Sequence, residues 1–469
     1  MSADNTLIHS QKYSFLLVSS LSAFMGTLDA SIVNVSLPTL SRIFAVSIQD
    51  IAWVVLAYTL TISATLLFVG RISAKRGFRY TYKMGFGLFT LGSLLCGLST
   101  DFETLVLSRV LHGIGASFLM ASGPALITRA FPANERGKAL GIMGTVVGVG
   151  LMSGPPIGGL IVSTIGWQWM FLLNIPIGIF GYIHASRLLK LMKPDAPDTR
   201  LNYLGGVLQA GAVVFLLLFL NRLNSTDWPQ LVLYSILILG LSSLALFIWR
   251  ELKSEHPLIG LKIFAYREFT IAISAMMISF ICTASGMVLI PFYLEELLLF
   301  SPTQVGLVIM TIPICMAVVA PVAGRISDKI GYKLLTISGL VMMSAGIFWI
   351  STLDQNSTRL DVVIRLIVMG IGGGMFQVPN SSVMMASVPR HFTAVASSLL
   401  AVSRTLGLAG GVAVATAAFA YRQTIYSSIM GEADAFAEAF SWVMIGFGIF
   451  SLLAIVIAII RKNKLVNVD

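Results

Sequence analysis

The chain has 469 residues, of which 56% are hydrophobic and only 11% are charged, and its mean hydropathy is +0.88. About a quarter of the residues in soluble domains are charged, so this composition excludes an ordinary soluble enzyme. The formal net charge is +10, but the lysines and arginines stand in short segments between apolar runs. We therefore expect a polytopic α-helical protein of the lipid bilayer, with no nucleic-acid partner.

Apolar runs of about 18 to 25 residues are long enough to cross roughly 30 Å of hydrocarbon. The first, from about Tyr13 to Leu37, is too long for a cleaved signal segment, so we expect it to be the first membrane span. The sequence predicts fourteen transmembrane helices in all. They are centred near residues 25, 60, 90, 115, 150, 180, 212, 240, 280, 313, 343, 372, 407 and 449.

The basic residues predict the orientation of these helices. If the amino terminus is cytoplasmic, 24 of the 31 lysines and arginines fall on the cytoplasmic side and 4 on the other. Short cytoplasmic loops carry an excess of lysine and arginine. We therefore expect a multi-pass protein of the cytoplasmic (inner) membrane with both termini in the cytoplasm.

Two pairs of similar segments indicate an internal repeat. The sequence GRISAKRGFRYTYK at 70–83 is matched by GRISDKIGYKLLT at 324–336, and Arg109 with its following GIG is matched by Arg365 with GIGGG. The offsets, 254 and 256 residues, are nearly equal. Repeats of this size predict two related helix bundles. We expect six helices in 1–193, two inserted helices in 194–256 and six helices in 257–469.

Several kinds of chemistry have no support in the sequence. No segment has the GxxxxGK[ST] pattern of a phosphate-binding loop, and the histidines are scattered. Cys96, Cys282 and Cys315 are widely spaced within apolar runs, which is typical of inert packing residues. We expect no cofactor, no metal site and no enzymatic activity, so that any uphill transport draws on an ion gradient.

Charges within membrane spans are costly and are therefore candidate functional residues. Asp29 lies in the first span, and Arg109 and His112 lie in the fourth. At 1.5 Å per residue, Asp29 lies roughly 12 Å and Arg109 roughly 8 Å below the outer face, so the two side chains are within reach of each other. Asp29 is either a proton and cation site or one half of a static ion pair. His112 is either a proton relay or a neutral hydrogen-bonding group.

Further charges stand near the ends of the later spans. Asp361 precedes Arg365 by four residues, a spacing that places both on one helical face. Arg404 in the thirteenth span is either a packing anchor or a functional group. Glu295 and Glu296 are interpreted as a solvated outer rim, with attraction of substrate as the alternative.

The fifth span, GIMGTVVGVGLMSGPPIGG at 141–159, combines close-packing glycines with two prolines. Proline removes a backbone donor and bends a helix, which favours a conformational pivot over a generic close-packed helix. Polarisable and aromatic side chains elsewhere are candidates for an adaptable cavity, although packing alone also explains such residues. The cavity candidates are Phe24, Met25, Asn34, Met120 and Gln377.

These segments together resemble the major facilitator superfamily over nearly the whole chain. GRISDKIGYK is similar to the family's G-x-x-x-D-[RK]-x-G-[RK] loop, RVLHGIGA (109–116) to its fourth-span motif, and GLMSGPPIGG (150–159) to its antiporter motif. TLDASIVNVSLP (27–38) and WQWMFLLNIPIG (167–178) resemble segments of the fourteen-span drug/proton antiporters. By this resemblance the loop residues are Gly70, Arg71, Gly77, Gly324, Arg325, Asp328 and Gly331, and the antiporter-motif residues are Gly150, Gly154, Pro155, Gly158 and Gly159.

The resemblance implies a major facilitator fold and a proton-coupled exporter of the multidrug-efflux type, with a monomeric transport unit. Its cargo would be small, amphipathic and mono-cationic or neutral; dicationic cargo is disfavoured because the thirteenth span carries Arg404 and no carboxylate. Ala74 replaces the family's loop aspartate, which implies a weaker cytoplasmic latch in the first half. Two alternatives stay open: a dedicated exporter of an endogenous lipid, siderophore or metabolite, and a non-transporting sensor or assembly subunit.

Overall fold

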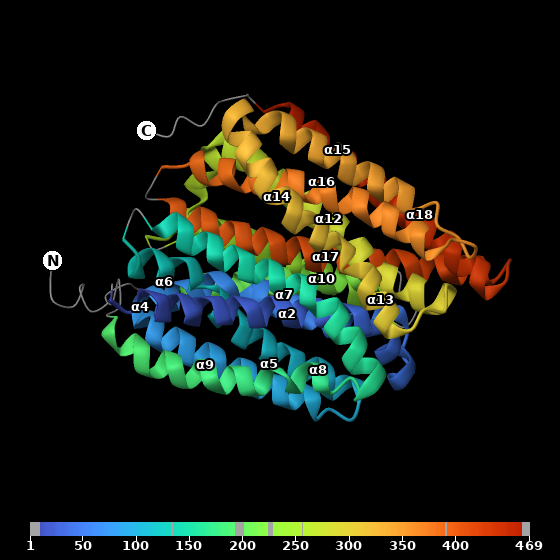
Figure 1. The fold of residues 1–469 in the computed structure, drawn as a ribbon, viewed down its shortest axis with the longest axis horizontal. Coiled ribbons are helices and arrows are strands. Elements are labelled where there is room, and N and C mark those ends of the chain that lie inside the picture. The colour runs from blue at the N-terminus through green and yellow to red at the C-terminus, as the bar shows by residue number, and fades with distance from the viewer. Residues whose placement is uncertain are drawn as a thin grey trace.

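The computed structural model describes residues 10–132, 135–192, 201–223, 228–255, 257–389 and 392–461, with the side chains of Leu191, Asp328 and Ala394 left aside. Within these residues the secondary structure is entirely helical (Figure 1). The domain boundary predicted at 193–194 lies outside the described residues, as does part of the boundary at 256–257. The division into domains therefore stays a prediction.

The helices follow one another in the order expected for two bundles with a pair inserted between them. The first half contains α2 (Lys12–Phe44), α3 (Ile48–Ile51), α4 (Trp53–Gly97), α5 (Phe102–Met120), α6 (Gly123–Ala130), α7 (Arg136–Thr164), α8 (Trp169–Leu172), α9 (Asn174–Leu188) and the short η1 (Leu189–Leu191). The inserted pair is α10 (Tyr203–Arg222) and α11 (Gln230–Lys253). The second half contains η2 (Leu261–Ala265), α12 (Arg267–Phe292), η3 (Tyr293–Leu297), α13 (Pro302–Ile309), α14 (Thr311–Ile330), α15 (Tyr332–Ile350), α16 (Arg359–Ala386), α17 (Thr393–Ser427) and α18 (Glu432–Ile459).

The described residues contain 13 helical segments long and apolar enough to cross a membrane. One of them, Ile48–Gly97, has 50 residues, or about 75 Å at 1.5 Å per residue, which is more than twice the hydrocarbon thickness. It bends at Gly77, where φ is 81° and ψ is 166°, a conformation essentially restricted to glycine. This segment therefore holds two crossings, which brings the number to the fourteen that the sequence predicts.

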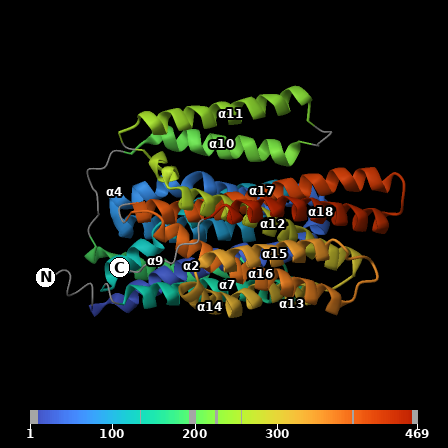
Figure 2. The ribbon, with the colours of Figure 1, turned by 90° about the horizontal axis from the view of Figure 1, so that it is seen from above.

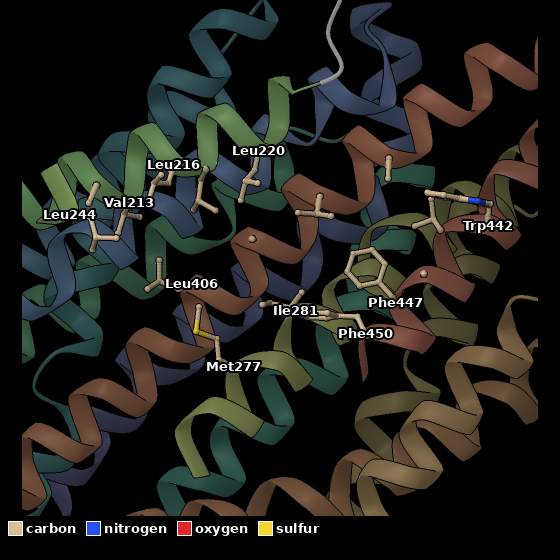
Figure 3. A pocket seen from close by; sticks show the side chains of 17 residues that line it. Val213, Leu216, Leu220, Leu244, Met277, Ile281, Leu406, Trp442, Phe447 and Phe450 are labelled. Carbon is tan, nitrogen blue, oxygen red and sulfur yellow. The ribbon is translucent and has the colours of Figure 1, made fainter. Parts of the chain in front are cut away.

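The inserted pair lies along one flank of the other helices (Figure 2). α10 packs against α4 and α17, whereas α11 packs mainly on α10. Between this pair and helices α12, α17 and α18 lies a cavity of about 710 Å³ (Figure 3). All its described lining residues are apolar except for the indole N–H of Trp442. It offers contacts to hydrocarbon and almost no partner for a polar cargo.

The two halves close against each other at one end, where α7 meets α13. We name this the outer end, and the opposite end, at which α2 begins, the inner end, after the predicted topology (Figure 1). A Cβ atom on Gly159 would overlap the carbonyl of Pro302, and one on Gly306 would overlap the carbonyl of Pro155. By contrast, glycines in the inner half of α7 have open space beside them. These are Gly137, Gly141, Gly144 and Gly148.

An ion pair adds to the closure of the outer end. Arg42 at the end of α2 contacts Glu295 in η3, and the hydroxyl of Thr39 donates a hydrogen bond of 2.8 Å to the same carboxylate. The interpretation of Glu295 as a solvated rim residue is wrong, because only 4% of it is exposed. Glu296 is exposed, as predicted. The structure is therefore sealed at its outer end.

Candidate functional site

Asp29 of α2 and Arg109 of α5 form a fully buried ion pair. Arg109 Nη1 lies 2.7 Å from Asp29 Oδ2, and the two side chains are 1% and 0% exposed. Arg109 Nε also donates to the carbonyl of Val54, and its guanidinium stacks 4.1 Å from the ring of Tyr58. A buried charge without its partner would cost several kcal/mol, about 3–5 in measured cases. The pair therefore fixes α2, α4 and α5 to one another.

His112 extends this pair into a polar chain. Its Nδ1 lies 2.9 Å from Arg109 Nη1, which can only donate, so Nδ1 accepts and the imidazole in this arrangement is neutral with its proton on Nε2. Nε2 lies 3.3 Å from the hydroxyl oxygen of Ser93, which also accepts a hydrogen bond from Asn174 of α9. The chain thus runs from α2 through α5 and α4 to α9.

Glycines bring α5 close enough to α4 for these contacts. A Cβ atom on Gly92 would lie 2.6 Å from the Cα of His112, and one on Gly113 would lie 2.8 Å from the carbonyl of Tyr58. A larger residue at either position would push the helices apart. The GIG segment after Arg109 therefore belongs to the site because it sets the spacing of the charged groups.

One oxygen of this site has no hydrogen-bond partner among the described residues. Asp29 Oδ1 is buried and lies 3.8 Å from His112 Nδ1, beyond hydrogen-bonding distance. A buried carboxylate oxygen with an unused lone pair is a position at which a proton can be accepted. The geometry therefore offers a proton-binding atom next to an arginine that holds the ionised form.

A second cavity, of about 320 Å³, lies between the two halves toward the inner end. Of the predicted cavity residues, Met120 and Gln377 line it. Phe24, Met25 and Asn34 do not: Met25 is fully buried against α9, and Asn34 donates to the carbonyl of Ala30 in its own helix. The described lining residues from the first half are Ser19, Ser22, Ala23, Gly26, Thr27, Leu119, Met120, Gly123, Pro124, Met143 and Val147, and those from the second half are Met276, Phe280, Gln377, Ser381, Ser397, Leu400, Ala401 and Arg404.

Asp29 stands behind the wall of this cavity rather than in it. Gly26 and Thr27 line the cavity, whereas Asp29, two residues further along α2, faces α4 and α5. Two residues correspond to about 200° around a helix, so the two positions occupy opposite faces of α2. In this conformation the buried pair and the cavity are connected through the body of α2.

The glycines of the antiporter motif have two distinct roles in packing. Gly150, Gly154 and Gly158 face Thr27, Ser31 and Ile32 of α2, whereas Gly159 and Pro155 meet α13. Pro155 has no N–H group, so the carbonyl four residues earlier lacks its helical partner. The hydroxyl of Ser31 donates to that carbonyl, of Leu151, at 2.9 Å. The motif thus joins α2, α7 and the second half at one place.

The two repeated loops share a backbone geometry but differ in their contacts. Gly331 has φ 86° and ψ 160° and separates α14 from α15, as Gly77 bends α4. Arg71 donates to the carbonyls of Pro257 and Leu258, which precede α12. Gly70 has open space beside it, and Gly324 lies near Val378. No contact of Arg325 is recorded among the described residues, and the side chain of Asp328 lies outside them.

The other intramembrane charges occupy different surroundings. Asp361 and Arg365 pair at 3.8 Å, as their spacing predicts, and Arg365 also donates to the carbonyl of Trp349. These contacts fix the outer end of α16. Arg404 of α17 lines the central cavity.

Two acidic residues that sequence reasoning missed or misplaced have structural roles. Glu295 pairs across the two halves, as described above. Glu251 of α11 is buried and accepts the backbone N–H groups of Leu258, Ile259 and Gly260. The signal available for Glu251 was its place at the end of an apolar run, which is equally typical of a solvated helix end.

Comparison with known proteins settles the family. The sequence model of the Major Facilitator Superfamily matches residues 19–412 and, in a second alignment, residues 271–465. The chain belongs to this superfamily. The overlapping alignments agree with a repeat in which either half resembles the same pattern. Members of the superfamily among its relatives are transporters, so the chain is a multi-pass membrane transporter.

Two curated members of the superfamily cover most of the chain. The riboflavin transporter RibZ of Clostridioides difficile is 36% identical over 432 residues, covering 92% of this chain and 93% of the relative. The multidrug resistance protein Stp of Mycobacterium tuberculosis is 29% identical over 406 residues, covering 85% and 74%. A solved structure of the peptide transporter POT in complex with sulfate has a TM-score of 0.69 at 14% identity, covering 95% and 94%. This last likeness shows the fold alone.

Proposed function

We propose that the chain is a proton-coupled antiporter of the inner membrane that exports small amphipathic compounds, with both termini in the cytoplasm and the monomer as the transport unit. The observation that carries this proposal is the buried Asp29–Arg109 pair. Protonation of Asp29 would remove the charge that neutralises Arg109, so the two protonation states favour different arrangements of α2 and α5.

The position of α2 gives this change a route to the cargo. α2 presents Gly26 and Thr27 to the central cavity, Ser31 to the carbonyl of Leu151 in α7, and Arg42 to Glu295 of the second half. A shift of α2 on protonation therefore acts on the cavity wall, the antiporter motif and the outer closure at once. In this scheme proton and cargo exchange through α2 rather than by direct competition at Asp29 in the conformation described.

Two candidate functions share this mechanism and differ in the breadth of the cargo. The similarity to Stp supports multidrug efflux, and the methionine-rich cavity wall suits varied apolar cargo. The similarity to RibZ, which is the higher in identity, supports the alternative of a dedicated metabolite transporter, with riboflavin or a compound like it as a candidate cargo.

Transport by purified protein in proteoliposomes tests the proposal. A proton gradient is imposed, and proton flux through a pH-sensitive dye is recorded on adding riboflavin and a panel of structurally unrelated amphipathic compounds. Proton flux with several compounds supports multidrug efflux, and flux with riboflavin alone supports the dedicated transporter. A non-transporting sensor predicts no cargo-dependent proton flux, and that result would contradict the proposal.

A further inference from the structure

Arg404 differs from the other deeply placed arginines in having nothing recorded to neutralise it. Arg109 has Asp29, Arg365 has Asp361, and Arg461 has Glu268 at 3.3 Å. Among the described residues Arg404 has no ion pair and no hydrogen bond, although it lines the central cavity. A guanidinium keeps its charge and carries five N–H donors. Its donors are therefore available to whatever occupies the cavity.

The helical spacing of α17 points this arginine at the cavity. Ser397, Leu400, Ala401 and Arg404 line the cavity at intervals of three and four residues, so they form one face of the helix. Arg404 is also the one charged side chain among the described lining residues. The local charge of the cavity is therefore positive.

The remaining lining defines what accompanies this charge. Gln377, Ser381 and Ser397 add neutral hydrogen-bonding groups in the second half. Met120, Met143 and Met276 provide flexible apolar contacts around them. Few polar groups set in an apolar wall are the usual composition of a site for a small organic ligand, and a volume of about 320 Å³ lies at the lower end of the usual range.

We propose that Arg404 is an anion-recognition residue of the central cavity and that the cargo is a small amphipathic compound with one anionic group, such as a carboxylate, sulfonate or phosphate. This inference rests on the proposed transport function and deepens it by naming the class of cargo. It differs from the mono-cationic or neutral cargo predicted from the sequence, because a cation in this cavity would meet an unneutralised guanidinium.

The charge of the cargo has an energetic consequence. Export of a monoanion and entry of a proton both move positive charge toward the cytoplasm. A negative potential inside the cell would therefore assist the exchange together with the pH gradient. A neutral cargo would be driven only through the charge of the proton.

Equilibrium binding to the detergent-purified protein tests the inference without any gradient. The probes are two dyes with one xanthene body, the anionic fluorescein and the cationic rhodamine 6G, followed by fluorescence anisotropy. We expect saturable binding of fluorescein to the wild type, with weaker binding of rhodamine 6G. Arg404→Gln should weaken fluorescein binding roughly 10- to 100-fold, the range for loss of one charge-assisted hydrogen bond, and Arg404→Lys should retain part of it.

A matched control separates this role from a general effect of removing an arginine. Arg422 lies on the same helix but stacks on Trp442, 3.9 Å from the ring, outside the described cavity lining. Arg422→Gln should leave fluorescein binding unchanged, and elution of each variant on size exclusion checks its folding. Absence of saturable fluorescein binding to the wild type, equal binding by wild type and Arg404→Gln, or a wild-type preference for rhodamine 6G would overturn the inference. Since no proton gradient is present, such a failure leaves the test of proton coupling through Asp29 independent.

Discussion

Gly77 and Gly331 lie 254 residues apart and adopt nearly the same backbone conformation, with φ of 81° and 86° and ψ of 166° and 160°. Each glycine stands at the inner bend between two membrane crossings of its half. The match in sequence between the two loops is therefore also a match in backbone geometry. It explains why the loop motif requires glycine at this position, since other residues are strained there.

Replacing either glycine by alanine should destabilise the protein. Gly77→Ala and Gly331→Ala should each cost about 1–3 kcal/mol, because a Cβ atom is strained in this region of φ/ψ space. The measurement is the thermal unfolding midpoint in detergent. Gly70→Ala is the control, since a Cβ atom at Gly70 meets nothing within 4 Å. Equal midpoints for Gly70→Ala and Gly331→Ala would contradict this account of the loop.

The contact between α7 and α13 should decide how firmly the outer end closes. Gly159→Ala should force the helices apart at a cost of about 1–3 kcal/mol, because the added methyl overlaps the carbonyl of Pro302. Spin labels at the exposed positions Ile165 and Leu307, in a variant without the native cysteines, should then report longer distances. Gly148→Ala, in the same helix but with open space beside it, should leave the distances unchanged. An unchanged distribution in Gly159→Ala would show that this contact does not hold the outer end closed.

The ion pair between Arg42 and Glu295 should act on the same closure. Glu295→Gln removes the buried charge that Arg42 contacts across the two halves, so the same pair of spin labels should show a larger open population. The neighbouring Glu296 is exposed, and Glu296→Gln is the matched control. The exchange variant Arg42→Glu/Glu295→Arg should restore part of the closure. Failure of Glu295→Gln to change the distances more than Glu296→Gln would refute the role of the pair.

Much of the fold was accessible from the sequence, because membrane spans, charge asymmetry and repeated motifs are local signals. The proximity of Asp29 and Arg109 was also predictable, since both are rare intramembrane charges and the rise of a helix fixes their depth. The rotation of α2 was not. Its residues are apolar or small on several faces, so nothing in the sequence distinguishes the cavity-facing Thr27 from the inward-packed Met25.

The pairing of Glu295 was hidden for a different reason. Span boundaries read from sequence are uncertain by several residues, and a carboxylate at such a boundary is equally compatible with solvent and with burial. Its partner Arg42 is more than 250 positions away in the chain. Only the packing of η3 against the end of α2 brings the two together. The availability of Arg404 was likewise a matter of tertiary contacts.

The stability of the buried pair can be separated from its function by a double variant. Asp29→Asn alone leaves Arg109 buried without a counter-charge, so it should lower stability by about 3–5 kcal/mol. Asp29→Asn/Arg109→Gln removes both charges and should recover most of that loss, as measured by thermal unfolding. An additive loss in the double variant would argue against direct coupling of the two residues.

Uphill transport by Asp29→Asn is the most direct test of proton coupling through this pair. Proteoliposomes with a proton gradient would be compared with proteoliposomes without one, using a cargo identified in the dye assay and the same cargo preloaded for exchange. The account predicts that the wild type accumulates cargo only with the gradient, whereas Asp29→Asn exchanges preloaded cargo but accumulates none. Gradient-driven accumulation by Asp29→Asn at the wild-type level would contradict it.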